Sequence, residues 1–296
     1  MRLAVTGTTG QLVRSLAAAN VKGCEVVAIG RPALDLSAPE GIEAAIAAVK
    51  PDLIVNAAAY TAVDKAESEP EVADAVNAAG AEAVGRTATR LGVPVIHVST
   101  DYVFDGSKPV PYVESDPVAP LGAYGRSKYE GERRLMAACP EAIVLRTAWV
   151  YSPYGHNFVK TMLRLAETRD EISVVDDQLG NPTYAPHLAD AIIAISRHVL
   201  EGGSTAWGLY HAAGSGDVTW CGFAREVFAA SARHDGPTAN VKPITTADYP
   251  TPARRPANSR LDGSKLREAF GVRLPAWQEG VADCVARLAA ERKSAS

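Results

Sequence analysis

The sequence predicts an α/β fold in which a doubly wound parallel sheet is joined by a smaller lobe. Short apolar runs alternate with longer amphipathic runs through the first half of the chain. The short runs lack the strict apolar–polar alternation of a sheet with one exposed face, so both faces of the sheet should be buried. Strands that alternate with helices in this way pair in parallel through right-handed crossovers.

The elements of the first half follow one another regularly. Proline ends two helices just before a strand, at Pro51 and Pro94. The predicted strands are residues 3–6, 25–29, 53–56, 93–99 and 143–147, and the predicted helices are residues 10–19, 39–49, 70–91 and 123–138.

The pattern after Trp149 is less regular. We expect helices at residues 157–166, 186–200, 218–232 and 275–292, with short strands at 172–175 and 208–211. Residues 242–259 hold four prolines and few apolar side chains, which predicts an ordered loop or lid.

The composition of the 296 residues excludes several classes of protein. Thirty lysines and arginines against 34 aspartates and glutamates give a net charge of −4, which argues against a nonspecific grip on nucleic acid. No apolar run reaches the ~18 residues of a membrane span. The four cysteines show no zinc spacing, and the first residues lack a signal peptide. We therefore expect a cytoplasmic protein without a disulfide framework.

Gly7 and Gly10 lie between the first predicted strand and the first predicted helix. Glycine there lets the backbone turn sharply towards a pyrophosphate, whose charge is stabilised at the helix N-terminus, so we predict a dinucleotide site. Val13 stands where a third glycine is usual, which predicts a first helix slightly further from the sheet.

The second predicted strand ends at Gly30-Arg31, without the Asp or Glu that would bind the ribose 2′-hydroxyl of NAD. The guanidinium of Arg31 suits a 2′-phosphate instead, so we predict NADPH as the preferred cofactor and NADH as the alternative. Asp35 and Leu36 follow closely and should border the adenine ring.

Tyr124 and Lys128 are four residues apart on a predicted helix and therefore share one face. An ammonium beside a phenol lowers the pKa of the phenol, which prepares it for proton transfer at neutral pH. Ser99, Thr100 and Asp101 end the fourth predicted strand, where parallel sheets bind their ligands. Together these residues predict a site that exchanges a proton with a substrate oxygen.

Other polar or aromatic residues indicate chemistry less clearly. His97 lies inside a predicted strand and is expected in the core, and the remaining histidines show no metal spacing. The acidic segment at residues 64–71 is typical of a solvated helix entry. Trp149 follows the fifth predicted strand, and its ring suits either a flat ligand ring or packing at the lobe boundary.

Several segments together resemble the extended short-chain dehydrogenase/reductases, and within them the reductases of sugar nucleotides. The likeness covers nearly the whole chain in order. The segments are TGTTGQL at 6–12, VNAAAYTAVDKAE at 55–67, STDYVFDG at 99–106, YGRSK at 124–128, RTAWVY at 146–151, DQLGNPT at 177–183, and RP at 255–256 with NSRL at 258–261.

The resemblance implies a Rossmann-type dinucleotide-binding domain at residues 1–148, completed by parts of 171–200, and a substrate-binding lobe formed mainly by 149–296. It makes Tyr124 the proton donor, Lys128 the partner of the nicotinamide ribose, and Thr100 the partner of the keto oxygen. The implied substrate contacts are Thr100, Asp101 and Trp149. The implied cofactor contacts are Gly7, Gly10, Gln11, Leu12, Arg31, Asp35, Leu36, Ala59, Tyr60, Thr61, Val98, Tyr124 and Lys128. Some members hold magnesium at a glutamate where this chain has Ser15, so no metal is expected.

The implied activity is reduction of the 4-keto group of dTDP-4-dehydro-6-deoxy-L-mannose by NADPH. The product, dTDP-L-rhamnose, would serve the synthesis of cell-wall or surface polysaccharide. The expected partner is the sugar nucleotide, with no nucleic acid or membrane partner, and the chain is expected to be a monomer or a homodimer.

Two alternatives stay open. A related sugar-nucleotide dehydratase or epimerase is one, but dehydratases resemble Thr-Asp-Glu after the fourth strand, and here the third residue is Tyr102. The other is a non-catalytic NADP-binding subunit, similar to the regulatory subunit of methionine adenosyltransferase. Such a subunit would bind a stoichiometric synthetase partner.

Overall fold

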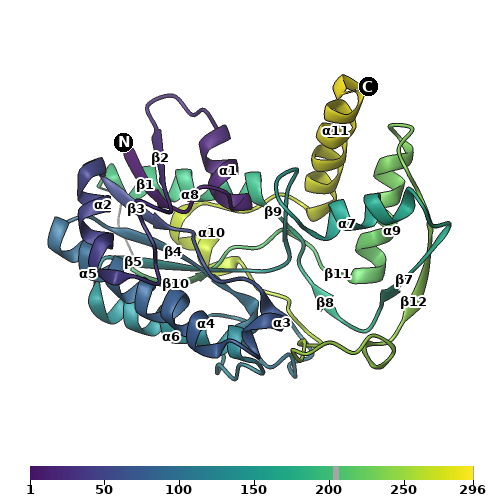
Figure 1. The fold of residues 1–296 in the computed structure, drawn as a ribbon, viewed down its shortest axis with the longest axis horizontal. Coiled ribbons are helices and arrows are strands. Elements are labelled where there is room, and N and C mark those ends of the chain that lie inside the picture. Colours follow the sequence, from purple (N-terminus) through teal and green to yellow (C-terminus); the bar gives the residue numbers. More distant parts are fainter. Residues whose placement is uncertain (203–206, 296) are drawn as a thin grey trace.

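The computed structural model describes residues 1–202 and 207–295. Within these ranges the main sheet has six parallel strands in the order β10-β5-β4-β3-β1-β2 (Figure 1). The chain passes from β1 to β2 on one side and then crosses to β3 on the other. The predicted doubly wound parallel sheet is therefore confirmed, and its strand order reverses between β1 and β3. The strands are β1 (Arg2–Thr6), β2 (Glu25–Ile29), β3 (Leu53–Asn56), β4 (Val95–Thr100), β5 (Ala142–Thr147) and β10 (Gly208–His211).

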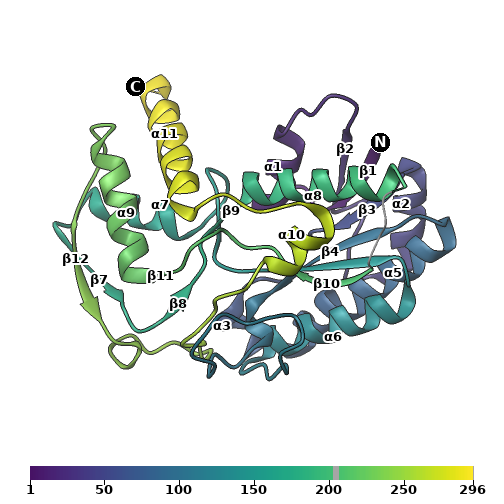
Figure 2. The same ribbon diagram turned by 180° about the vertical axis from the view of Figure 1, so that it is seen from behind.

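Helices cover both faces of this sheet, as Figures 1 and 2 show. Helices α1 (Gln11–Ala18) and α8 (Ala185–Leu200) bury side chains such as Leu16 and Ile192 against one face. Helices α2 (Ile42–Val49), α5 (Gly80–Leu91) and α6 (Ala123–Ala138) cover the other face, with Ile46, Val84 and Leu135 buried there. The two apolar faces explain why the strands read as continuous apolar runs.

A smaller lobe stands beside the carboxyl ends of the strands. Its core is formed by helices α7 (Phe158–Ala166), α9 (Trp220–Ala232) and α11 (Trp277–Ala295) with the parallel pair β7 (Glu171–Val175) and β12 (Asn240–Ile244). Two short pairs link it to the main sheet: β6 (Val150–Tyr151) with β9 (Thr183–Tyr184), and β8 (Leu179–Gly180) with β11 (Val218–Thr219). None of the described helices has the length and apolar character needed to span a membrane.

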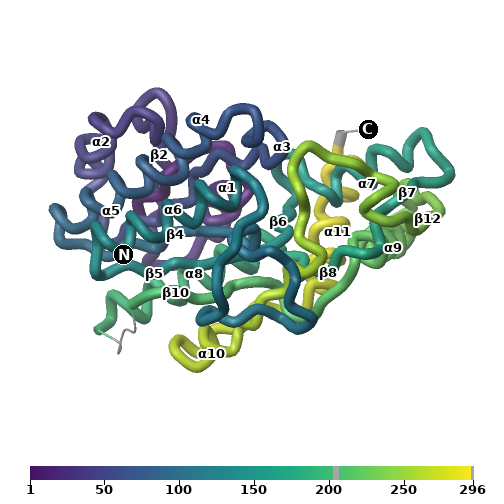
Figure 3. The backbone as a smooth tube through the Cα atoms, turned by 90° about the horizontal axis from the view of Figure 1, so that it is seen from below, coloured from purple at the N-terminus to yellow at the C-terminus, as the bar shows by residue number. Residues whose placement is uncertain are grey.

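The structure differs from the sequence prediction at three places. The strand predicted at 208–211 has the bounds of β10, but its place was not predicted: it completes the main sheet beside β5, with α10 (Ser264–Phe270) next to it (Figure 3). Strand β12 occupies the start of the predicted loop 242–259, where Pro243 is tolerated because the strand has a single neighbour. The predicted helix 70–91 is α4 (Pro70–Asp74), a π-helical turn at Ala75–Ala79, and then α5.

Candidate active site

The turn after β1 has the geometry of a phosphate cradle. Gly7 has φ +95°, a conformation that glycine adopts without strain, and its N–H donates to the carbonyl of Ile29 at 2.6 Å. Helix α1 begins after Gly10, and no side chain in the described ranges caps that end, so its first N–H groups face the exposed turn 8–10. Val13 is buried in the core, and its methyl group would lie 3.4 Å from a Cβ placed on Gly7. These features fit a bound pyrophosphate.

Gln11 and Leu12 lie at the start of α1, but their side chains point to different surroundings. The amide of Gln11 bonds the segment after β6: its oxygen accepts from Ser152 and Asn157 at 2.8 and 3.0 Å. Leu12 is buried in the core between α1 and the sheet. Gln11 thus connects the phosphate cradle to the segment that leads into the smaller lobe. Leu12 can contribute only its backbone N–H to the cradle, because its side chain is in the core.

Arg31 stands directly beside this cradle. A Cβ on the preceding Gly30 would lie 3.1 Å from the side chain of Thr8, so the end of β2 borders the glycine turn. Arg31 is largely exposed and forms an ion pair with Asp35 at 2.7 Å. Hydrogen bonds from Ser37 and Arg31 lower the pKa of Asp35 to about 2. Leu36, by contrast, is buried in the core.

The loop after β3 is fixed by buried hydrogen bonds. Thr6 Oγ1 accepts the N–H groups of Ala57 and Ala58 at 3.1 and 3.0 Å, which leads Ala59, Tyr60 and Thr61 along the strand ends. Asn77, from the π-helical turn, bonds both the N–H and the carbonyl of Tyr60. It also donates to Ser127 on α6 at 3.0 Å. Asn77 cannot be recognised from the sequence, because its role depends on the local π-helical geometry.

Tyr124 and Thr100 come together beside Asp101 in a buried cluster. Thr100 ends β4, accepts from the N–H of Tyr102 at 3.2 Å and donates to the carboxylate of Asp101 at 3.1 Å. Burial raises the pKa of Tyr124 above its ordinary value, while the hydroxyl of Thr100 acts in the opposite direction. Burial thus favours the neutral form of Tyr124, which carries a proton, and the hydroxyl of Thr100 is the group that moves its pKa back towards neutrality.

Lys128 lies one turn after Tyr124, as the spacing predicts, but its Nζ donates to the carbonyl of Val98 at 2.7 Å. Burial lowers the pKa of Lys128 to about 8, against the effect of the Glu132 carboxylate. Lys128 is not among the groups that shift the pKa of Tyr124: burial raises that pKa, Thr100 lowers it, and Asp101 and Tyr102 add to the rise.

Asp101 carries a carboxyl oxygen, Oδ2, that has no hydrogen-bond partner among the described residues although it is buried. Burial raises the pKa of this carboxyl to about 6, against hydrogen bonds from Ser259 and Thr100. An unpartnered buried acceptor beside Thr100 and Tyr124 fits a hydroxyl of a bound ligand.

Trp149 is half-buried and forms a stacked pair with Trp220, with ring centroids 3.6 Å apart and planes 11° apart. Its backbone has φ +47°, a strained conformation for a large residue. A Cβ on Gly180 would lie 2.3 Å from the ring of Trp149, so only glycine fits there. Trp149 thus contacts Gly180 at the lobe boundary and Trp220 in the smaller lobe. The contact with Trp220 was not predicted from the sequence.

The segment after β12 crosses over to the loops of the main sheet. Arg255 donates to Asp64 at 2.9 Å and to the hydroxyl of Tyr102 at 2.8 Å. The ring of Tyr102 packs edge-on against Tyr124 at 5.5 Å. Glu67 also has a structural role, because its carboxylate accepts from the N–H of Ala123 at the start of α6. The acidic segment 64–71 is thus more than a solvated helix entry.

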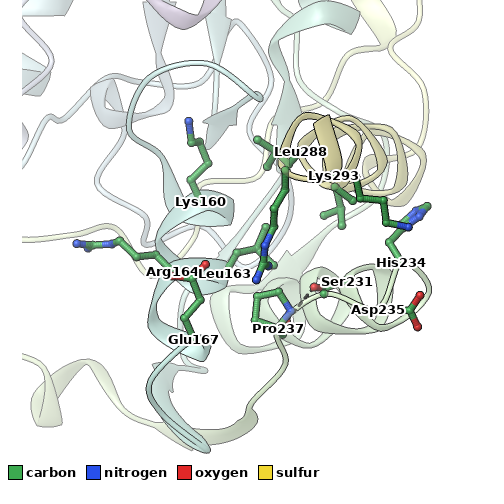
Figure 4. Close-up of a pocket in the computed structure, with 14 residues that line it drawn as sticks. Lys160, Leu163, Arg164, Glu167, Ser231, His234, Asp235, Pro237, Leu288 and Lys293 are labelled. Carbon is green, nitrogen blue, oxygen red and sulfur yellow. Dashed lines mark hydrogen bonds between the residues drawn. The ribbon is translucent and has the colours of Figure 1, made fainter. Parts of the chain in front are cut away.

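A cavity of about 480 Å³ lies in the smaller lobe, between α7, α11 and the turn after α9 (Figure 4). Figure 4 shows Lys160, Arg164 and Glu167 on one wall and Leu288 and Lys293 on another. Its lining includes none of the predicted site residues. Across the described part of the chain, no group of three His, Cys, Asp or Glu residues is arranged to hold a metal ion.

The chain is similar to known proteins over nearly its whole length. A family described as RmlD substrate binding domain matches residues 1–290. A dTDP-4-dehydrorhamnose reductase of Sinorhizobium fredii is 51% identical over 296 residues, which cover 100% of each chain. The crystal structure of a dTDP-4-dehydrorhamnose reductase from Clostridium acetobutylicum matches with a TM-score of 0.89 and 35% identity, covering 97% of this chain and 99% of that one. The same enzyme from Bacillus anthracis, in complex with NADP, matches with a TM-score of 0.89, 34% identity and the same coverage.

Proposed function

The chain belongs to the dTDP-4-dehydrorhamnose reductase family, and from this premise we propose which of its residues carry out the reaction. The reaction is reduction of the 4-keto group of dTDP-4-dehydro-6-deoxy-L-mannose to dTDP-L-rhamnose with NADPH. The main support for the assignment is that Thr100, Asp101 and Tyr124 form a buried cluster. Lys128 lies one helical turn after Tyr124 on α6. The relatives named above are reductases, which favours this function over a non-catalytic NADP-binding subunit.

Tyr124 donates the proton and Thr100 bonds the keto oxygen. When bound, NADPH supplies a hydride to the keto carbon. Burial favours the neutral form of Tyr124, so its hydroxyl has a proton to donate as negative charge develops on the oxygen of the substrate. Thr100, whose hydroxyl donates to Asp101 in this structure, turns that hydrogen bond to the keto oxygen of the substrate and holds it beside the phenol. Lys128 holds the nicotinamide ribose. Burial of the cluster strengthens each of these hydrogen bonds by excluding water.

The turn from Gly7 to Leu12 holds the pyrophosphate with backbone N–H groups, and Arg31 receives the 2′-phosphate of the adenosine end. Ala59, Tyr60, Thr61 and Val98 would contact the cofactor from the carboxyl ends of β3 and β4. The observations in support are the uncapped start of α1 and the exposed guanidinium of Arg31 beside Thr8. Asp35 orients that guanidinium by its ion pair.

The test of the function is direct. The purified protein receives the 4-keto sugar nucleotide and NADPH, and the absorbance of reduced nicotinamide is followed together with the sugar product. We expect stoichiometric oxidation of NADPH and formation of the rhamnosyl nucleotide. Absence of turnover with both NADPH and NADH, together with recovery of a stoichiometric synthetase partner, would support the regulatory subunit. The cytoplasmic location, the oligomeric state and the receiving polysaccharide stay predictions.

Replacing Arg31 with Ala should raise the KM for NADPH more than the KM for NADH. A charge-assisted hydrogen bond to a phosphate contributes about 1.5–3 kcal/mol, so we expect a 10- to 100-fold loss with NADPH. Steady-state kinetics with both cofactors measure the ratio. Arg90→Ala is the matched control, because Arg90 is also exposed and ion-paired, with Glu43. Equal losses with NADPH and NADH would exclude Arg31 as the reader of the 2′-phosphate.

Trp149→Ala should weaken binding of the sugar nucleotide and leave NADPH affinity nearly unchanged, because we assign its ring to the substrate. Trp220→Ala should have a weaker effect of the same kind, about 2- to 10-fold, because it removes only the stacked support of Trp149. Isothermal titration with each ligand measures both affinities, and circular dichroism checks folding. Exposed Trp207→Ala serves as the control. A Trp149→Ala protein that does not fold would show that the ring fills the lobe boundary instead.

A further inference from the structure

Glu132 forms a buried ion pair behind the candidate site. Its carboxylate accepts two hydrogen bonds from Arg146, at 2.9 and 2.6 Å, in the forked geometry of a guanidinium–carboxylate pair. It also accepts from the hydroxyl of Ser99. The side chains of Glu132 and Arg146 are only 1% and 3% exposed. A buried pair of this kind is a weak source of stability, because desolvation offsets most of the attraction. Its position therefore invites a functional explanation.

The pair joins α6, which bears Tyr124 and Lys128, to β4, which bears Thr100, and to the neighbouring strand β5. Glu132 is four residues after Lys128 and eight after Tyr124, so all three lie on one face of α6. Ser99 immediately precedes Thr100 on β4, and Arg146 lies opposite Ser99 on β5. The contacts of Glu132 therefore fix the distance between the face of α6 that bears Tyr124 and the end of β4 that bears Thr100.

The same carboxylate is placed to act on the charge of Lys128. Burial lowers the pKa of Lys128 to about 8, and Glu132 is the charged group that raises it. From β4, His97 faces Lys128, and burial together with the charge of Lys128 lowers the pKa of that imidazole, which keeps it neutral. From β5, Arg146 faces Glu132. Asp101 acts on Tyr124 instead.

The other elements packed against α6 present their charges to other parts of the helix. Asp74 of α4 and Glu82 of α5 act on Arg134, and Glu67, just after the short helix α3 (Val63–Ala66), accepts a hydrogen bond from the first N–H of α6. These groups leave Glu132 as the acid beside Lys128 in the described part of the chain.

We propose that Glu132 is a positioning residue for the reduction: it keeps Lys128 in its charged form and, through Ser99 and Arg146, holds the Tyr124 helix at its working distance from Thr100. The inference rests on the roles of Tyr124 and Lys128 proposed above. A protonated Lys128 is the form that donates hydrogen bonds to ribose hydroxyls. Loss of the Glu132 charge should therefore affect cofactor binding and turnover at alkaline pH first.

The test uses Glu132→Gln, which keeps the shape and removes the charge. NADPH affinity, measured by fluorescence from pH 6 to 10, should begin to fall about 1 pH unit lower than in the parent protein. The alkaline limb of the pH profile of kcat/KM should move by the same amount. In a Lys128→Met background, Glu132→Gln should cause no further shift, because the titrating group is gone. Glu130→Gln is the control: Glu130 lies on the same helix and pairs with surface arginines, so its loss should leave both profiles in place.

A second variant covers the case in which the unpaired Arg146 prevents folding. Glu132→Gln combined with Arg146→Gln removes both charges, and its alkaline limbs should still lie below those of the parent. The inference would be overturned if a folded Glu132→Gln protein had the same alkaline limbs of NADPH affinity and kcat/KM as the parent. It would also be overturned if Glu130→Gln shifted these limbs equally. Tyr124→Phe, measured beside these variants, separates the proposed role of Tyr124 from the proposed role of Glu132. Full activity of Tyr124→Phe refutes the proposed role of Tyr124 as proton donor, whereas unshifted alkaline limbs in Glu132→Gln beside an inactive Tyr124→Phe protein refute only the role of Glu132.

Discussion

Tyr124→Phe should lower the turnover number by about 10²–10⁴-fold, because that is the usual contribution of a positioned acid to proton transfer. The substitution removes one oxygen and keeps the ring, so the edge-on contact with Tyr102 at 5.5 Å should survive. NADPH affinity should change little for the same reason. The measurement is the reduction rate of the 4-keto sugar nucleotide beside NADPH binding by fluorescence. A Tyr124→Phe protein that reduces the sugar at the parent rate would refute the proton-donor assignment.

Two neighbouring substitutions make the result specific. Lys128→Ala should reduce turnover and NADPH affinity together, because it removes the ribose contact as well as the charge. Thr100→Val removes one buried hydrogen bond to the keto oxygen, which contributes roughly 1–3 kcal/mol, so its loss of turnover should be smaller than that of Tyr124→Phe. Equal losses in all three variants would indicate a shared folding defect rather than three separate roles.

Local patterns predicted most of the main sheet and its helices. Apolar runs and proline boundaries placed five of its strands, a sixth was predicted at 208–211 without its place in the sheet, and the predicted helix 123–138 has the bounds of α6. The missed features depend on partners distant in the sequence. Strand β12 needs β7 as its neighbour, and β10 joins the main sheet only because residues 208–211 return to β5. Neither pairing leaves a signal in the local sequence.

The candidate site shows the same division. Tyr124 and Lys128 were predicted because their spacing of four residues is itself the geometry of one helix face. Glu132 and Arg146 were missed because single charged residues ordinarily lie on the surface, and their pairing joins α6 to β5. Trp149 could not be assigned from sequence because its surroundings come from Gly180 and Trp220, in two other segments.

Asp101→Asn should stabilise the protein at pH 8 and lower its activity. The carboxyl of Asp101 has its pKa raised from 3.8 to about 6 by burial, so the folded state binds its proton more tightly than the unfolded chain does. Stability from this group is therefore present below about pH 4 and is lost as the pH rises through about 6. At a pH at which Asp101 is ionised in both the folded and the unfolded state, this pKa shift lowers the free energy of unfolding by about 3 kcal/mol. The neutral amide of Asp101→Asn should recover about 1–3 kcal/mol of that loss.

Urea unfolding of Asp101→Asn and the parent protein at pH 4 and pH 8 measures this difference. The two proteins should have similar stability at pH 4, and the variant should be the more stable at pH 8. Asp105→Asn is a control of opposite sign, because hydrogen bonds from Ser107 lower the pKa of Asp105 and its charge stabilises the folded state. Equal stability of Asp101→Asn and the parent at both pH values would show that folding does not raise the pKa of Asp101. If the variant is more stable but less active, then the buried carboxyl of Asp101 lowers the stability of the protein but is needed for activity. A hydroxyl of the substrate would then donate a hydrogen bond to the unpartnered Oδ2.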